Sequence, residues 1–167
     1  MTQRPLRYAV HGPMFSGKTT LSKLLRDAGF TYVNYTDYGK TLIARSLTAL
    51  LGREVTQEEV IARKNEWRGY IITGLRIYGF DEGRGVEDLL RDLPATTPIV
   101  FDNVRYLSQY EALKPYGFTL VRLVVSPHEQ ENRAIRAGMS RDELLRLREE
   151  SSEQPVPEQP GEITICT

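Results

Sequence analysis

Residues 12–19, Gly-Pro-Met-Phe-Ser-Gly-Lys-Thr, constrain the fold of this chain most, because they match the phosphate-loop pattern G-x-x-x-x-G-K-[ST] at every fixed position. A short β-prone run at 6–11 precedes the motif, and apolar residues at helical spacing follow it from 18 to 28. Such a loop needs this context, since its donors are backbone N–H groups and the N-terminus of the following helix. The sequence therefore predicts a site for nucleotide phosphates; a glycine turn that only opens a helix is the alternative.

The motif assigns a role to several of its positions. Gly12 and Gly17 let the backbone wrap closely, Lys18 reaches the β- and γ-phosphates, and Thr19 offers its hydroxyl to Mg²⁺. Pro13 has no N–H group, so the donors must come from the later half of the loop. The predicted nucleotide-binding residues are Gly12, Pro13, Met14, Phe15, Ser16, Gly17, Lys18, Thr19 and Thr20.

Strand-like and helical segments alternate along the whole chain. The expected strands are 6–11, 30–35, 98–101, 119–125 and 162–166, and the expected helices are 18–28, 39–51, one from 57 past 71, 107–116, 128–137 and 140–150. The glycine-rich segment 78–85 is expected to be a surface loop. This alternation predicts an α/β fold with a parallel sheet and helices on both faces. A length of 167 residues fits a single domain.

Two aspartates follow expected strands, at the sheet edge where open α/β folds bind ligands. Asp102 follows the wholly apolar run 98–101 and is a candidate carboxylate for the magnesium side of the phosphate site; the alternative is a cap on the next helix. Asp37 follows the second strand, where a carboxylate facing the γ-phosphate accepts a proton from an attacking hydroxyl. The alternative for Asp37 is a turn residue.

Arginines are the other requirement of phosphoryl transfer, because the reaction concentrates negative charge. Arg105 lies just beyond Asp102, at the same strand end. Two further groups flank the middle helix and the late helical pair, and their members are Arg63, Arg68, Arg76 and Arg84, then Arg133, Arg136 and Arg141. For each of these, a solvated helix face is the alternative. His11 and His128 have no neighbours that suggest a metal site, so we expect structural roles for both. Tyr38 and Phe80 either stack on a base or pack.

Charge and composition exclude several classes of protein. The chain carries 22 Lys and Arg against 22 Asp and Glu, which disfavours non-specific nucleic-acid binding. It contains no apolar run near the roughly 20 residues that span a bilayer, and from the residues at its start we expect no signal peptide. Cys166 is the single cysteine, so a disulfide framework is excluded. We expect a cytoplasmic monomer or homodimer without a membrane partner.

Several segments together resemble bacteriophage-type deoxynucleoside monophosphate kinases, which are relatives of dephospho-CoA kinase and of the nucleoside monophosphate kinases. The resemblance rests on the phosphate loop, Asp37, the segment 74–80 that leads to Arg84, and Val-Phe-Asp-Asn-Val-Arg-Tyr at 100–106 followed by Glu111. It implies a three-layer α/β/α P-loop NTPase fold over residues 1–167, with a helical lid at 128–150. It also implies ATP as donor, Mg²⁺ as cofactor and a deoxynucleoside monophosphate as acceptor.

The resemblance also implies roles for individual residues. Lys18 and Thr19 are the donor-phosphate and metal residues, with Asp102 as a second metal residue, and Asp37 lies by the acceptor. The implied catalytic set is Lys18, Asp37, Arg133 and Arg136, and the implied substrate-binding set is Asp37, Arg68, Arg84, Asp102 and Arg105. Two positions depart from the family pattern, since Asn103 stands where an acid is common and Tyr38 where proline is common.

The acceptor stays open at the level of sequence. The first hypothesis is a small nucleotide acceptor, and dephospho-CoA is a related possibility. The second is a hydroxyl on a modified base in DNA, which the same fold can serve because fold does not determine substrate. The third is a nucleotide-binding switch that hydrolyses ATP without an acceptor.

Overall fold

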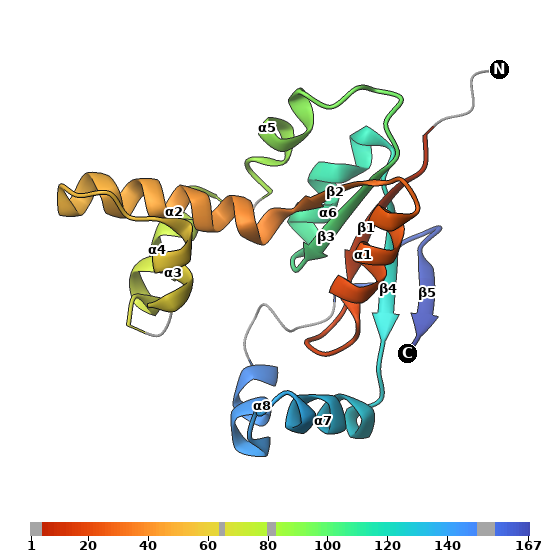
Figure 1. The fold of residues 1–167 in the computed structure, drawn as a ribbon. Helices are drawn as coiled ribbons and strands as arrows, with labels where there is room; N and C mark the ends of the chain where they lie inside the picture. The colour runs from red at the N-terminus through yellow and green to blue at the C-terminus, as the bar shows by residue number, and fades with distance from the viewer. Residues whose placement is uncertain (1–4, 64–65, 80–82, 150–155) are drawn as a thin grey trace.

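A computed structural model describes residues 5–63, 66–79, 83–149 and 156–167 (Figure 1). These residues form one five-stranded sheet with the order β2-β3-β1-β4-β5, in which every neighbouring pair is parallel. The strands are β1 (Arg7–His11), β2 (Thr31–Asn34), β3 (Ile99–Val104), β4 (Thr119–Val124) and β5 (Ile163–Cys166). Because all strands run the same way, their carboxyl ends meet at one edge of the sheet.

Eight α-helices and a short 3-10 turn connect these strands in the described part of the chain. They are α1 (Lys18–Asp27), α2 (Tyr35–Leu51), α3 (Gln57–Ala62), α4 (Arg68–Ile77), α5 (Val86–Arg91), α6 (Leu107–Leu113) with the turn Lys114–Tyr116, α7 (Pro127–Arg136) and α8 (Arg141–Arg148). Figure 1 shows α2, α3 and α4 projecting away from the sheet, and α7 with α8 beyond the end of β4. None of the helices described is long and apolar enough to cross a bilayer.

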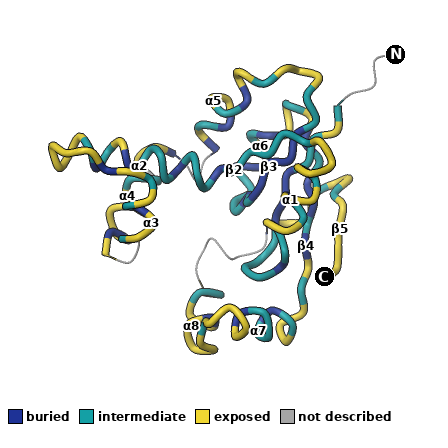
Figure 2. Tube along the Cα trace, in the orientation of Figure 1, coloured by how far each residue is buried: buried dark blue, intermediate teal, exposed yellow. Residues whose placement is uncertain are grey.

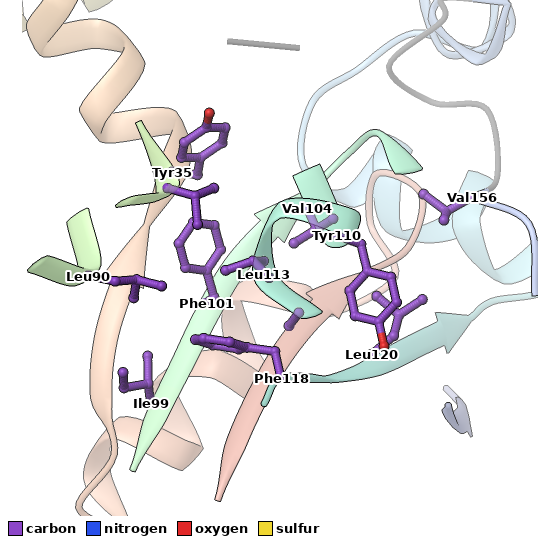
Figure 3. Packing of buried hydrophobic residues seen from close by; sticks show 12 residues of the cluster. Tyr35, Leu90, Ile99, Phe101, Val104, Tyr110, Leu113, Phe118, Leu120 and Val156 are labelled. Atoms are coloured by element: carbon purple, nitrogen blue, oxygen red, sulfur yellow. The ribbon is translucent and has the colours of Figure 1, made fainter. Parts of the chain in front are cut away.

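Two apolar clusters cover the two faces of the sheet, which confirms the three-layer α/β/α architecture. On one face, Leu21 and Leu25 of α1 pack with Val10, Val100 and Leu123. The opposite face packs against α5 and α6, and Figure 3 shows this cluster around Phe101, with Leu90, Tyr110, Leu113 and Phe118 among its members. Residues 99–102 are all buried, as predicted for a strand covered on both faces.

The projecting helices have a small core of their own. Ile43, Leu47, Val55, Val60 and Trp67 are buried together between α2, α3 and the start of α4. Figure 2 shows exposed residues along the outer turns of these helices, in contrast to the buried central strands. This arm therefore holds its shape through local packing while its base joins the sheet at the end of β2.

The start of α2 differs from the sequence prediction. The helix begins at Tyr35 and not at 39, because the Asn34 side chain accepts hydrogen bonds from the N–H groups of Thr36 (2.9 Å) and Asp37 (3.2 Å). An asparagine in this position satisfies donors that the first helical turn leaves free. Asp37 therefore lies in the first turn of α2, so the predicted start of this helix at 39 and the alternative of a turn residue at Asp37 were both wrong.

The middle of the chain also differs from expectation. The predicted continuous helix from 57 past 71 was wrong, because α3 ends at Ala62 and α4 begins at Arg68. Helix α5 was not predicted; it follows Gly85, which has a positive φ of 91°. Part of the expected loop at 78–85, including Phe80, lies outside the described residues.

Strand β3 continues further than predicted. It runs to Val104, so Asp102 and Asn103 lie inside the strand and not beyond its end. Asn103 has a φ of 69°, and the pairing of β1 with β3 shifts register between Ala9 and His11. A left-handed residue with a register shift is typical of a bulge, which redirects side chains at a strand end.

Candidate active site

The phosphate loop lies between the carboxyl end of β1 and the start of α1, as predicted. At Gly12 a Cβ atom would lie 2.7 Å from Ser16 Oγ and 2.8 Å from the Leu123 carbonyl oxygen, so only glycine fits. Phe15 has a φ of 60° and Gly17 a φ of 91°. A non-glycine residue such as Phe15 rarely adopts this region, and it does so where surrounding structure holds it there.

The inside of the loop offers donors that suit a polyphosphate. Lys18 Nζ donates to the carbonyl oxygens of Gly12 and Pro13, each at 2.7 Å. Ser16 Oγ is buried and has no hydrogen-bond partner within the described ranges. Burying an unpartnered hydroxyl is unfavourable, so a bound phosphate oxygen would remove this cost. The ammonium and the orphaned hydroxyl together fit the predicted anion.

The outside of the same loop is held by side chains from the late part of the chain. The three contacts are Gln130 Nε2 to Met14 O (2.9 Å), Arg133 Nη1 to Phe15 O (3.1 Å) and Thr167 Oγ1 to Ser16 O (3.2 Å). A side chain from the late part of the chain thus engages each of these three carbonyls. Gln130 and Thr167 were missed by the sequence analysis, because no local pattern indicates which loop they contact.

A pocket of about 560 Å³ opens beside the loop. Its walls include Thr20, Leu24, Leu123, Arg133, Ile165 and Thr167. Leu24 and Ile165 are exposed apolar side chains in this wall, 62% and 36% accessible. Apolar walls with a few polar groups are typical of small-molecule sites. A pocket of this kind beside the loop suits the flat aromatic base of a nucleotide whose phosphates the loop binds.

Asp102 lies on β3, the strand next to β1, and is 1% exposed. Its Oδ2 accepts a hydrogen bond from the Tyr32 hydroxyl at 2.9 Å, and that hydroxyl in turn accepts from Asn34 Nδ2 at 3.0 Å. Burial, together with the nearby Asp102 carboxylate, raises the pKa of Tyr32 to about 12, so the phenol keeps its proton and donates. The other oxygen, Oδ1, is buried without a hydrogen-bond partner among the described residues.

The donor set fits Mg²⁺ bound mainly through nucleotide phosphates. The described residues contain no group of three or more His, Cys, Asp or Glu side chains that would cage a metal ion. Mg²⁺ usually takes one or two protein oxygens, with phosphates and waters completing its octahedron. The Thr19 hydroxyl at the start of α1 and the unpartnered Oδ1 of Asp102 are oxygen donors of this kind.

Asp37 lies at the N-terminus of α2, next to this group. Its half-exposed carboxylate forms an ion pair with Lys40 (2.8 Å), and its backbone carbonyl accepts hydrogen bonds from Thr41 Oγ1 and Gln57 Nε2, each at 3.1 Å. The charge of Asp37 contributes to raising the pKa of Tyr32, as that of Asp102 does, so the two carboxylates share one region. Lys40 was not singled out from the sequence, although its spacing of three from Asp37 favours such a pair.

Among the predicted arginines whose side chains the structure describes, Arg133 contacts the phosphate loop. Arg136 is exposed at the end of α7. Arg105 follows β3, and its backbone N–H donates to Gln109 Oε1 at 2.8 Å. The Arg84 side chain is exposed and lies against Gly79. Arg68 begins α4, and its side chain, like that of Arg76, lies outside what the structure describes.

Two predicted arginines form ion pairs with neighbouring acids instead. Arg63 pairs with Glu66 and Glu59 and lies 4.2 Å from the centre of the Trp67 ring. Arg141 pairs with Glu131 at 3.1 Å. These contacts match the solvated-helix alternative.

Tyr38 and His11 each have defined partners in the structure. Tyr38 stacks near Tyr35, with ring centres 6.3 Å apart, and donates to Asp88 at 3.3 Å. His11 Nε2 accepts from the Val156 N–H at 3.1 Å, so Nδ1 carries the proton and donates to Val104 O at 2.9 Å. Burial lowers the pKa of His11 to about 4, which keeps the ring neutral. The structural role expected for His11 is confirmed.

Comparison with known proteins supports the fold. No family model and no curated protein matches the sequence. Solved structures do match over nearly the whole chain: TT1252 from Thermus thermophilus (TM-score 0.57, 18% identity, 99% of this chain and 90% of that one), a gluconokinase from Sinorhizobium meliloti 1021 (0.52, 19%, 98% and 83%) and a sugar kinase from Janibacter sp. HTCC2649 (0.51, 18%, 98% and 85%).

These similarities, together with the loop, define the class of fold. The chain has the three-layer α/β/α fold of P-loop kinases, with a parallel sheet in the order 2-3-1-4-5. At 18–19% identity the likeness extends to the fold and not to a substrate. The narrower resemblance to bacteriophage-type deoxynucleoside monophosphate kinases rests on the sequence motifs alone.

Proposed function

We propose that this protein is a kinase that transfers the γ-phosphoryl group of ATP, bound with Mg²⁺, to a (deoxy)nucleoside monophosphate. The observation that carries the proposal is the phosphate loop itself: its carbonyls at 14–16 are held from outside, while the Lys18 ammonium and the orphaned Ser16 hydroxyl lie inside. The loop also adjoins a pocket suited to a base and the strand that carries Asp102. These features support a donor site for a nucleoside triphosphate.

The chemistry requires positioning and charge stabilisation more than covalent catalysis. An acceptor oxygen forms a bond to the γ-phosphorus as the bond to the β–γ bridging oxygen breaks, and ADP leaves. Lys18 and the loop N–H groups would neutralise the donor phosphates, and Thr19 and Asp102 would hold Mg²⁺, which offsets charge on the β- and γ-oxygens. Arg136, which is exposed on the helix that follows β4, would approach the transferring group.

Asp37 and the arginines Arg68, Arg84 and Arg105 would bind the acceptor. Asp37 lies at the carboxyl edge of the sheet, on the helix whose far part forms the projecting arm. An acceptor phosphate carries its own negative charge and needs cationic partners, which these arginines would supply. The acceptor would therefore bind between the start of α2 and the end of β3.

A hydroxyl acceptor is the second candidate, and two observations favour it. Two of the structural neighbours are described as a gluconokinase and a sugar kinase. Asn103 Oδ1 is buried without a described partner, and the Asp37 carboxylate is half-exposed; both oxygens accept hydrogen bonds from hydroxyls. For such an acceptor, Asp37 would act as general base. A hydroxymethylated base in DNA belongs to this class, although the zero net charge disfavours a polymer.

A coupled assay of ADP release separates these functions. The acceptors would be dAMP, dGMP, dCMP, dTMP and a modified pyrimidine monophosphate, then gluconate and simple sugars, then hydroxymethylated and unmodified duplex DNA. We expect release that depends on a monophosphate and is lost in Lys18→Ala, while Lys23→Ala, an exposed position on the same helix, retains it. Release that needs no acceptor would indicate a switch ATPase. Absence of Lys18-dependent release with every acceptor would overturn the proposal.

A further inference from the structure

Gln130 has both ends of its side-chain amide engaged. The side chain lies on α7 and the residue is 6% exposed. Its Nε2 donates to Met14 O at 2.9 Å, and its Oε1 accepts from Arg148 Nε at 2.9 Å. Arginine can only donate, so the amide oxygen must face Arg148 and the amide nitrogen must face the loop. The second arm of Arg148 donates to Pro127 O at 3.1 Å, which ties α8 to the start of α7.

These contacts surround the strained residue of the phosphate loop. The peptide plane is rigid, so holding the Met14 carbonyl also directs the Phe15 N–H to the opposite side. Gln130 thus holds the peptide unit before Phe15, and Arg133 holds the unit after it through the Phe15 carbonyl. Phe15 has the left-handed φ of 60°, a conformation that persists only where neighbours impose it. The anion-binding shape of the loop therefore depends on α7.

We propose that Gln130 is a positioning residue for the phosphate loop and that, through Arg148, it couples the packing of α8 to nucleotide binding. This inference rests on the proposed function, because it assumes that the loop binds a nucleotide. The coupling is reciprocal by thermodynamic linkage: nucleotide that favours the bound shape of the loop also stabilises α7 and α8.

Direct binding of a non-hydrolysable ATP analogue with Mg²⁺ tests the first half. In Gln130→Glu the carboxylate keeps the shape and the Arg148 contact but cannot donate to Met14 O. We expect a Kd about tenfold weaker and a raised KM for ATP, with kcat at saturating ATP within about twofold of wild type. Gln159→Glu is a matched control, since Gln159 also donates to a carbonyl (Pro157 O, 2.9 Å) and accepts from a cation (Lys114, 3.0 Å). We expect the control to bind as wild type does.

A double-mutant cycle with Arg148 tests the second half. Arg148→Ala should weaken analogue binding in the wild-type chain and should have no further effect in Gln130→Ala, because the coupling passes through one side chain. Amide exchange across 141–148 should slow on analogue binding in the wild type and stay unchanged in Gln130→Ala. The unfolding temperature of each variant shows whether it is folded. If Gln130→Ala does not fold, analogue binding by Gln130→Glu still tests the positioning role, and analogue binding by Arg148→Ala still tests the coupling.

The outcomes separate this inference from the proposed function. A wild-type chain that does not bind the analogue would refute the function itself. If the wild type binds, Lys18→Ala abolishes binding and Gln130→Glu binds as wild type, the positioning role is wrong while the function stands. Equal slowing of exchange at 141–148 in the wild type and Gln130→Ala would overturn the coupling.

Discussion

The Tyr32 hydroxyl on β2 donates to Oδ2 of Asp102 on β3 at 2.9 Å, and this contact leaves the other carboxylate oxygen unpartnered among the described residues. Asn34 donates to the same hydroxyl at 3.0 Å, which directs its hydrogen toward Asp102. A buried carboxylate with one oxygen held in this way presents the other in a defined direction. The Tyr32 hydroxyl therefore orients Asp102 so that Oδ1 remains available to the proposed Mg²⁺ site.

Replacing Tyr32 by phenylalanine removes that donor. We expect Tyr32→Phe to lose about 1–3 kcal/mol of stability, since it leaves Oδ2 buried without its donor. We also expect the Mg²⁺ concentration for half-maximal activity to rise several-fold. Denaturant unfolding and a Mg²⁺ titration of ADP release measure the two effects. Tyr8→Phe is the control, because Tyr8 stacks its ring on Phe30 (5.7 Å between centres). Equal behaviour of the two variants would contradict the role of the hydroxyl.

Gly12→Ala should weaken nucleotide binding while the chain remains folded. The new Cβ would lie 2.8 Å from the Leu123 backbone oxygen, which cannot move aside without distorting β4. We expect analogue binding to fall by more than about tenfold, which corresponds to about 1.4 kcal/mol or more. Gly69→Ala provides the comparison, since its Cβ meets no atom within 4 Å and alanine is favoured in a helix. Retained binding in Gly12→Ala would show that the loop tolerates a side chain.

The stability of the folded chain should decrease as the pH is lowered, because of His11. Burial lowers the pKa of His11 from 6.5 to about 4 in the folded chain, so between these values the unfolded chain binds more protons. Stability is then fully present above pH 6.5 and is lost as the pH falls toward 4, by about 3 kcal/mol at most. His11→Gln should flatten this part of the pH profile, measured by urea unfolding. An unchanged slope in the variant would assign the pH dependence to other groups.

The Arg122–Glu162 pair should contribute more to stability than exposed pairs do. Arg122 Nε and Nη2 donate to the two Glu162 oxygens at 2.8 and 3.0 Å, and the side chains are only 11% and 10% exposed. Removing Arg122 leaves the largely buried Glu162 carboxylate without its partner. We therefore expect Arg122→Ala to lower the free energy of unfolding by about 3 kcal/mol. Nucleotide binding should weaken too, because the pair joins β4 to the segment leading into β5, which carries Ile165 of the pocket.

An exposed pair gives the control for this comparison. Arg91 and Asp88 lie 2.6 Å apart, with side chains 69% and 53% exposed. Arg91→Ala should change the free energy of unfolding by less than about 1 kcal/mol, since solvent screens the pair. A loss in Arg122→Ala no larger than that in Arg91→Ala would show that the buried pair contributes little.

The phosphate loop and the alternation of strands and helices were predictable from the sequence alone. Gly12, Lys18 and Thr19 lie within eight residues of one another, so their spacing specifies the turn and the helix start that follow. The apolar run 98–101 likewise predicted a strand covered on both faces, since every residue in it needs burial. Such features depend on contacts between near neighbours in the chain or on simple hydrophobic patterning.

The surroundings of the loop could only come from tertiary structure. Gln130 meets Met14, Thr167 meets Ser16 and Tyr32 meets Asp102 because the sheet order brings their strands and helices together. Local contacts decided two further features. The Asn34 cap places Asp37 in a helix, and Arg63 forms ion pairs with Glu59 and Glu66. Sequence thus determined the loop that we propose binds the nucleotide phosphates. Folding in three dimensions decided which distant side chains hold that site, because hydrogen bonds depend on distance in space and not along the chain.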